Sequence, residues 1–282
     1  MKISVYLPTK NRSKLLKRAV ESVLNQEYKN LELIVVDDGS EDETPQMMAY
    51  FVKGDNRVTY LRNDKSVGAP ASRNRAIKEA KGDFVTGLDD DDRFHTGRLS
   101  ALVEYWGIQS KYNNNISGIY TQEVGEIDGV ASGTSRKLST VKFDDFPDNN
   151  QIGNQIFSPK SHYEAIGGFD ESMPAWQDME LFIRMTKSFG PARLLDIPLY
   201  YIDNTPRTDR ISSHEQRVRK ACQLVIERHY PGRPRDHQKF WLQVFSPHYG
   251  FKPKFEDFQV FNKMGFWPGG LRKLIEAKTR AT

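Results

Sequence analysis

Apolar residues in the first part of the chain alternate between two spacings. Continuous apolar runs of strand length stand at residues 3–8, 31–36, 58–62 and 83–88. Between them, apolar residues recur at every third or fourth position, which predicts helices from about Arg12, over 43–53 and over 69–80. Strands separated by helices in this way indicate a parallel sheet with helices on both faces. Such sheets bind ligands beyond the carboxyl ends of their strands.

Beyond Trp106 the spacing is less regular. Further strands are expected within 118–134, 151–160 and 193–203, and helices over Trp176–Phe189 and Ser212–His229. The C-terminal stretch is rich in Phe and Trp, so we expect it to pack on the body of the protein as a helical appendage. The predicted class is α/β: a Rossmann-like, mostly parallel sheet covered by helices, with a helical, aromatic-rich C-terminal extension over 212–282.

Composition fits a folded enzyme-sized chain. The chain has 282 residues, of which 38% are hydrophobic, and one cysteine, Cys222, so it forms no internal disulfide. Because Cys222 lies on the apolar face of a predicted helix, we expect a packed thiol. The first residues lack the order of a signal peptide, and no apolar run is long enough to span a bilayer. The expected location is the cytoplasm, with peripheral contact to the inner face of the plasma membrane.

Charge divides the chain unevenly. Residues 203–282 hold 16 Lys/Arg and 8 Asp/Glu, whereas the first 202 residues hold 25 and 29. The basic C-terminal region favours contact with an anionic membrane or an anionic substrate, and a solvated surface is the alternative. No nucleic-acid-binding motif accompanies the charge, so nucleic acid is not expected as a partner.

Aspartates gather where the predicted strands end. The first strand ends in LPTKNR, the second in VVDDGS and the fourth in LDDDD. Turn formation and helix capping explain Gly39 and Ser40 but not four successive aspartates. Each close pair of these carboxylates repels by about 1 kcal/mol even in water.

A divalent cation would relieve this repulsion. In an extended segment Asp89 and Asp91 share a face, while Asp90 points elsewhere. Two carboxylates and a substrate diphosphate suit Mg²⁺ or Mn²⁺, and such a cation would stabilise charge on a departing phosphate.

These motifs together resemble family 2 glycosyltransferases of the GT-A fold. The matching pieces are SVYLPTKNR, LELIVVDDGSEDET, GAPASRNRAI, GDFVTGLDDDDRF and GGFDE…WQDMELFIR. They occur in the order and at the spacing of the family, and they cover about Lys2 to Ile211. The resemblance implies a GT-A domain over 1–211. Its nucleotide-sugar-binding half would be 1–110 and its acceptor-binding half 111–211.

The resemblance also implies roles for the donor-binding residues. Pro8, Thr9 and Asn11 would line the nucleotide pocket. Asp38 would accept a hydrogen bond from the imide N–H of uracil, which favours a UDP-sugar. Arg73 and Asn74 match the family's RN pair and would lie along the nucleotide.

In the acidic motif, the resemblance places Asp89 towards the ribose and metal-bound water, and Asp91 on the metal. Asp92 would orient its neighbours, and Asp90 and Asp92 would serve the turn. The loop is expected to be looser when no ligand is bound. The family commonly has a proline soon after this motif, whereas here RFHTGRL follows.

The catalytic base implied by the resemblance is Asp178 of WQDMELF, with Glu180 as the next candidate. A role for Asp178 as a helix cap alone is the alternative. One carboxylate suffices for inversion, because it takes the proton of the acceptor hydroxyl as that oxygen attacks the anomeric carbon.

Beyond Tyr201 the match to the family is loose. Arg207 and Arg210 suit binding of the diphosphate. His214 would be a third metal ligand, as a histidine is in some relatives, or an ordinary surface or core histidine. Trp176 would stack on a sugar ring or pack in the core.

The predicted activity is that of an inverting, metal-dependent hexosyl- or N-acetylhexosaminyltransferase. Its acceptor would be a glycan or a lipid-linked oligosaccharide of a bacterial surface polysaccharide or lipooligosaccharide. A glycoside hydrolase with paired carboxylates would not need the nucleotide-pocket motifs. A dinucleotide-binding oxidoreductase would need a G-x-G-x-x-G after the first strand. The D-x-D motif and Asp178 disfavour a catalytically silent sugar-nucleotide binding module.

Overall fold

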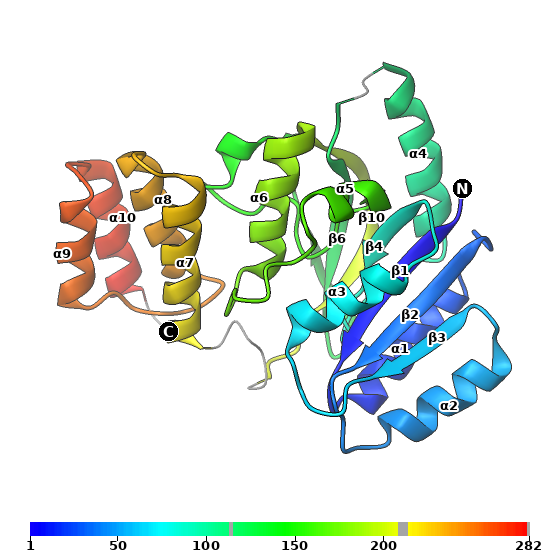
Figure 1. Cartoon of the computed structure of the whole chain (residues 1–282). Coiled ribbons are helices and arrows are strands. Elements are labelled where there is room, and N and C mark those ends of the chain that lie inside the picture. Colours follow the sequence, from blue (N-terminus) through cyan, green and yellow to red (C-terminus); the bar gives the residue numbers. More distant parts are fainter. Residues whose placement is uncertain (113–114, 208–213, 281–282) are drawn as a thin grey trace.

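The computed structural model describes residues 1–112, 115–207 and 214–280 (Figure 1). One five-stranded sheet forms the N-terminal half, in the order β3-β2-β1-β4-β9. The first four of these strands are parallel and β9 is antiparallel. Its strands are β1 (Ile3–Thr9), β2 (Leu31–Asp37), β3 (Val58–Arg62), β4 (Phe84–Gly87) and β9 (Ser158–Pro159). The predicted mostly parallel sheet is confirmed.

Helices cover both faces of this sheet. The helices are α1 (Ser13–Leu24), α2 (Thr44–Gly54) and α3 (Ala69–Glu79). Side chains alternate between the faces of a strand, so Val5 and Leu33 pack with α1 and α2, whereas Tyr6 and Ile34 pack with α3. All seven residues of β1 and of β2 are buried, which explains why these strands are almost continuously apolar.

A second sheet continues the fold in the order β5-β10-β6-β7, and β8 also pairs with β10. Its long central strands, β10 and β6, are parallel. The strands are β5 (Arg93–Phe94), β6 (Gly118–Ile127), β7 (Val130–Thr134), β8 (Thr140–Val141) and β10 (Ala192–Asp203), and helix α4 spans Arg98–Tyr112. A bridge between Ile119 and Phe157 connects the second sheet to the segment that leads into β9.

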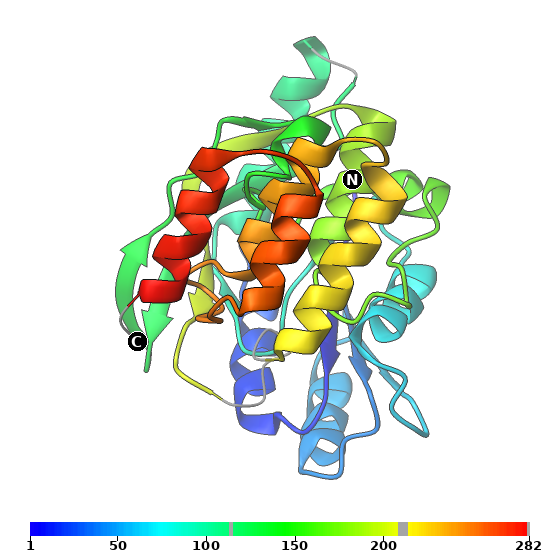
Figure 2. The same cartoon turned by 90° about the vertical axis from the view of Figure 1, so that its left-hand side faces the viewer.

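The remaining helices belong to the second half of the chain. They are η1 (Phe143–Asp145), α5 (Lys160–Ala165), α6 (Gln177–Phe189), α7 (Glu215–His229), α8 (Pro234–Val244), α9 (Phe255–Lys263) and α10 (Pro268–Thr279). Figure 2 shows the C-terminal helices side by side on one flank. In the described part of the chain, no helix combines the length and the apolar character needed to cross a membrane.

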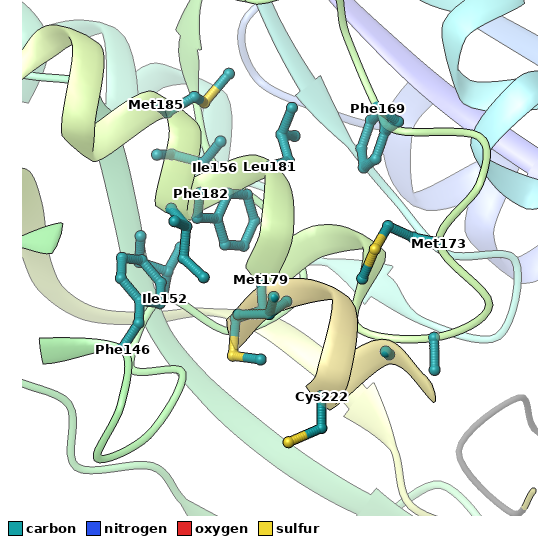
Figure 3. Close-up of a cluster of buried hydrophobic side chains, with 14 of the residues drawn as sticks. Phe146, Ile152, Ile156, Phe169, Met173, Met179, Leu181, Phe182, Met185 and Cys222 are labelled. Carbon is teal, nitrogen blue, oxygen red and sulfur yellow. The ribbon is translucent and has the colours of Figure 1, made fainter. Parts of the chain in front are cut away.

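The C-terminal helices share a buried core with α6. Figure 3 shows Met179 and Phe182 of α6 in one apolar cluster with Phe146 and Cys222. Cys222 is fully buried and burial raises the pKa of its thiol, as expected for a packed cysteine. The extension is therefore fixed against the body by apolar packing.

Candidate active site

One large cavity opens at the carboxyl ends of β1, β2 and β4, with a volume of about 1260 Å³. Most of the residues predicted from the strand-end motifs line it. They are Pro8, Thr9, Asn11, Asp38, Arg73, Asp89, Asp91 and Asp178. The same cavity continues past Trp176 to the loop 147–154 and to helices α8 and α10. Its position at this sheet edge is where an open parallel sheet places its ligands.

Arginines neutralise the acidic loop that follows β4. Arg207 Nη2 lies 2.5 Å from Asp91 Oδ2, and Arg12 Nη1 lies 3.0 Å from Asp90 Oδ1 and 3.4 Å from Asp91 Oδ2. Guanidinium groups therefore offset part of the repulsion among the aspartates that a bound cation was expected to relieve. Arg12 stands in the quoted motif LPTKNR but was given no role from sequence.

Asp90 and Asp92 do more than serve the turn. Asp90 lines the cavity beside its neighbours, and it accepts a hydrogen bond from Thr9 Oγ1 at 2.8 Å. Asp92 is buried, and it accepts hydrogen bonds from Tyr200 Oη and from the backbone N–H of Asp203. These contacts tie the acidic loop to β1 and to β10. Burial raises the pKa of both carboxyls, that of Asp90 to about 6.

Arg73 links the acidic loop to the predicted base. Its guanidinium donates to Asp89 Oδ1 at 2.9 Å and to Gln177 Oε1 at 2.9 Å, and Nη1 lies 3.8 Å from Asp178 Oδ1. The side chain is almost fully buried and also covers the ring of Phe169. A buried cation between two carboxylates fixes the spacing between Asp89 and Asp178.

Asp178 is available for chemistry. It lies in the first turn of α6, and its side chain is 24% exposed to the cavity. Its Oδ1 atom is buried and has no hydrogen-bond partner among the described residues. Burial raises the pKa of Asp178 to about 6, and the Arg73 charge opposes that rise. A partly desolvated carboxylate with this pKa is suited to accept a proton near neutral pH.

The helix that carries Asp178 begins at a strained residue. Trp176 has the left-handed backbone conformation, with φ 57° and ψ 26°, which is uncommon for a bulky residue. Its Nε1 donates to Tyr249 Oη at 2.8 Å. Tyr249 follows α8, so the C-terminal region contacts the residue that sets the start of α6. Trp176 packs near Phe240 and also lines the cavity, and its stacking on a sugar ring stays a prediction.

Glu180 lies outside this cavity, although it shares the first turn of α6 with Asp178. It is buried, and Arg184 Nη2 lies 2.7 Å and His229 Nε2 2.9 Å from its carboxylate. These partners lower the pKa of Glu180 against the effect of burial. Its place as the second candidate base is therefore corrected: Glu180 forms a buried ion pair with Arg184 within α6 and contacts His229 of α7.

Asp38 lines the cavity, but its carboxylate is fully engaged. Oδ1 accepts from Asn63 Nδ2 and the backbone N–H of Val67, and Oδ2 accepts from Ser66 Oγ and the backbone N–H of Gly68. Gly68 has φ 93°, which lets the loop wrap around this carboxylate. For Asp38 to accept the predicted hydrogen bond from the imide N–H of uracil, one of these four donors has to move away from the carboxylate.

Asn74 is absent from the described cavity lining, and its predicted place along the nucleotide is corrected. Its amide exchanges two hydrogen bonds with the backbone of Phe169, at 2.7 and 2.9 Å, and also donates to Glu171. Successive residues of a helix point about 100° apart, so Arg73 enters the cavity while Asn74 holds the loop after α5.

We expect Asn74→Ala to reduce the free energy of unfolding by about 2 kcal/mol, because two buried backbone groups lose their partners. Donor affinity should stay within about twofold of wild type. Urea denaturation and nucleotide titration measure the two effects. A large loss of affinity with unchanged stability would restore Asn74 to the nucleotide site.

The residues fit a divalent cation that takes part of its coordination from substrate. Asp89 and Asp91 offer carboxylate oxygens beside an open cavity, which is the ligand type that Mg²⁺ and Mn²⁺ prefer. Within the described residues, no three His, Cys, Asp or Glu side chains form a metal-binding group. His214 is exposed at the start of α7 and is absent from the described cavity lining. The structure does not bring His214 together with Asp89 and Asp91. Arg210, which was predicted to bind the diphosphate, lies outside the described residues.

The fold and this site are those of a sugar-transferring enzyme, and comparisons with known proteins agree. Residues 4–128 match the family described as Glycosyl transferase family 2. WcaA of Escherichia coli, a glycosyl transferase assigned to colanic acid biosynthesis, is 36% identical over 195 residues, which are 67% of each chain. A GalNAc(5)-diNAcBac-PP-undecaprenol beta-1,3-glucosyltransferase of Campylobacter jejuni is 42% identical over 104 residues, covering 36% of this chain and 34% of that enzyme.

This protein belongs to glycosyltransferase family 2. Residues 1–349 of S. aureus TarS share the fold over 99% of this chain and 81% of theirs, with a TM-score of 0.65 and 19% identity. A mannosyltransferase of Pyrobaculum calidifontis, solved with GDP-Man and Mn²⁺, gives a TM-score of 0.58 at 16% identity, over 98% of this chain and 72% of that one. The predicted GT-A fold and family are confirmed, and the hydrolase and silent-module alternatives are not favoured.

Proposed function

We propose that this protein transfers a sugar from a UDP-sugar to a hydroxyl of a glycan, with inversion at the anomeric carbon and with a divalent cation. The observation that carries the proposal is the carboxylate of Asp178, which lines the cavity and whose Oδ1 atom has no hydrogen-bond partner among the described residues. Arg73 holds it at a fixed distance from the acidic loop. An acceptor hydroxyl bound between Asp178 and the acidic loop would have the catalytic base on one side and the donor sugar on the other.

The proposed roles follow from the positions of the side chains. Asp178 takes the proton of the acceptor hydroxyl, which makes that oxygen the nucleophile. Asp89 and Asp91 would hold Mn²⁺ or Mg²⁺, and such a cation, when bound, supplies positive charge to the departing diphosphate. Arg12 and Arg207 already lie against this loop and add positive charge where the diphosphate is expected. No covalent sugar–enzyme intermediate is required.

A UDP-sugar donor is supported by the residues that match the family at the strand ends. TarS was also solved with UDP-GlcNAc, and the mannosyltransferase with GDP-Man, so the fold accepts more than one base. The test is a screen of nucleotide sugars with and without Mn²⁺, which follows thermal stabilisation and hydrolysis. The proposal requires a UDP-sugar to stabilise the protein, and more strongly with metal. Preference for a guanine nucleotide would remove the role proposed for Asp38.

The proposed acceptor is a glycan or lipid-linked oligosaccharide in bacterial surface polysaccharide synthesis. The relatives support this class, since one is assigned to colanic acid biosynthesis and another is named for a lipid diphosphate-linked glycan. The same donor screen tests whether the transferred sugar is a hexose or an N-acetylhexosamine.

We also propose that the protein works in the cytoplasm, in peripheral contact with the membrane through its basic helical extension. Phe266, between α9 and α10, is 90% exposed, and Arg235 Nη2 donates to its backbone carbonyl. Such a combination of aromatic and basic residues favours an anionic lipid surface.

Co-sedimentation with phosphatidylcholine vesicles, with and without phosphatidylglycerol, tests this contact. We expect binding only to the anionic vesicles. Phe266→Ser should weaken it about threefold or more, since a buried aromatic side chain is lost from the lipid interface. Tyr112→Ser, which alters an equally exposed aromatic residue at the end of α4, is the matched control. Equal binding to both kinds of vesicle would refute the proposal.

A further inference from the structure

The cavity extends beyond the donor motifs and has two parts. The donor part is lined by acidic residues, among them Asp38, the acidic loop and Asp178, together with the arginines Arg12 and Arg73 that pair with them. The second part, which we call the acceptor arm, is bounded by loop 147–154, α8 and α10. Its charged lining residues are Lys239, Lys273 and Asp148, and His248 also lines it. Asp178 lines the same cavity as the acceptor arm.

The acceptor arm is preformed by contacts within the protein. Gln243 Nε2 of α8 donates to the backbone carbonyls of Phe146 and Pro147 at 2.7 and 2.8 Å, which fixes the start of loop 147–154. Lys239 Nζ lies 2.7 Å from Asp148 Oδ2 and joins the same loop to α8. The arm therefore needs no rearrangement of these elements to receive a ligand.

Trp267 provides a fixed aromatic surface in this arm. Its ring stacks on Phe261, and Arg235 lies 4.4 Å from the ring centroid. Gly270 permits this placement, because a Cβ atom there would lie 2.2 Å from Trp267. A partly exposed indole held on a cavity wall is suited to pack against a sugar ring.

The arm carries positive charge that the donor does not require. Lys273 is exposed, lies 5.9 Å from the Trp267 ring, and forms no ion pair with a described carboxylate. Among the carboxylates of residues 1–112, 115–207 and 214–280, Lys239 pairs only with Asp148, whose side chain is 65% exposed, so solvent weakens that pair. The Lys273 ammonium beside the Trp267 ring, with Lys239 on the same cavity wall, matches a saccharide that bears an oxyanion.

We propose that the acceptor arm binds an anionic saccharide, with its sugar on Trp267 and its phosphate or carboxylate on Lys273 and Lys239. This inference rests on the proposed transferase function and adds the chemical class of the acceptor. The anion has two sources: a uronic acid within the glycan, or the diphosphate that links a glycan to a lipid. In either case the acceptor hydroxyl would approach Asp178 from the side opposite the nucleotide.

Binding is measured by Trp fluorescence or calorimetry with the full chain, saturated with UDP and Mn²⁺ so that the donor part is filled. The probes are an oligogalacturonate, a short-alkyl diphosphate-linked N-acetylglucosamine and the matching neutral alkyl glycoside. We expect at least one anionic probe to bind about tenfold more tightly than the neutral glycoside, with weakening as salt rises. Preference between the two anionic probes identifies the source of the charge.

Charge reversal at Lys273 provides the second part of the test. Lys273→Glu should weaken binding of the anionic probe by about tenfold or more while UDP binding stays unchanged. Lys263→Glu, the matched reversal on α9 outside the cavity, should have less than about a twofold effect. Equal effects of the two variants, equal affinity for charged and neutral probes, or no binding of either anionic probe would overturn the inference. Failure of UDP binding in the same samples would count instead against the proposed function.

Discussion

Asp178→Asn is expected to lose sugar transfer by about a thousandfold while it keeps donor affinity close to wild type. The amide retains the size of the side chain and its place beside Arg73, but it cannot accept the proton of the acceptor hydroxyl. Steady-state transfer and nucleotide titration measure the two effects separately. Glu180→Gln is the matched control from the same helical turn. We expect it to lower stability, because it disturbs a buried ion pair, and to leave transfer within a few-fold. The reverse pattern would move the base to Glu180.

The raised pKa of Asp178 adds a pH signature to this prediction. Because the base must be ionised, transfer should rise with pH through about 6 and level off above it, and a cation bound nearby would move this limb to lower pH. The folded pKa lies above the usual value, so the ionised carboxyl destabilises the fold at pH 8 and not at pH 4. Asp178→Asn should therefore be more stable than wild type by about 1–2 kcal/mol at pH 8, with no such gain at pH 4. Thermal unfolding at both pH values checks this, and equal stability at pH 8 would contradict the desolvation argument.

Asp91→Ala should abolish metal-stimulated transfer, with a loss of at least about a hundredfold, and leave the protein folded. Asp91 is partly exposed at a cavity, and Arg12 keeps its contact with Asp90 when Asp91 is removed. The measurements are transfer as a function of Mn²⁺ concentration, Mn²⁺ binding and thermal unfolding.

Asp83→Ala is the matched control for Asp91, since Asp83 stands at the opposite end of β4 and accepts a hydrogen bond from the backbone of Lys2. It should not change the dependence on metal. Undiminished, metal-stimulated transfer by Asp91→Ala would end the metal assignment at this position.

The architecture was predictable because burial imposes a simple pattern. Strands β1 and β2 are buried on both faces, so their apolar runs and their ends were evident from sequence. Since parallel strands end at one edge, the aspartates after β2 and β4 could be placed in one site before the structure was known. The C-terminal helices were expected only as an appendage. Their arrangement depends on contacts such as Trp176 with Tyr249, which are distant in sequence.

The partners of the charged groups were not predictable. Asp89 pairs with Arg73, and Asp91 with Arg207, across 16 and 116 positions of the chain. Neither pair can be recognised from the local sequence. The sequence alone therefore indicated a set of uncompensated charges in the acidic loop. Asn74 and Glu180 show the same limit: each neighbours a cavity residue in sequence, but the turn of its helix directs it elsewhere.

The hydrogen bond between Trp176 and Tyr249 has a consequence for engineering. A shortened chain that ends before α8 would keep every nucleotide-pocket motif and yet lose the partner of the residue that begins α6. The left-handed backbone at Trp176 would then relax towards a commoner conformation. Chimeras that exchange the C-terminal helices between family 2 glycosyltransferases should therefore take Trp176 and Tyr249 from the same parent enzyme.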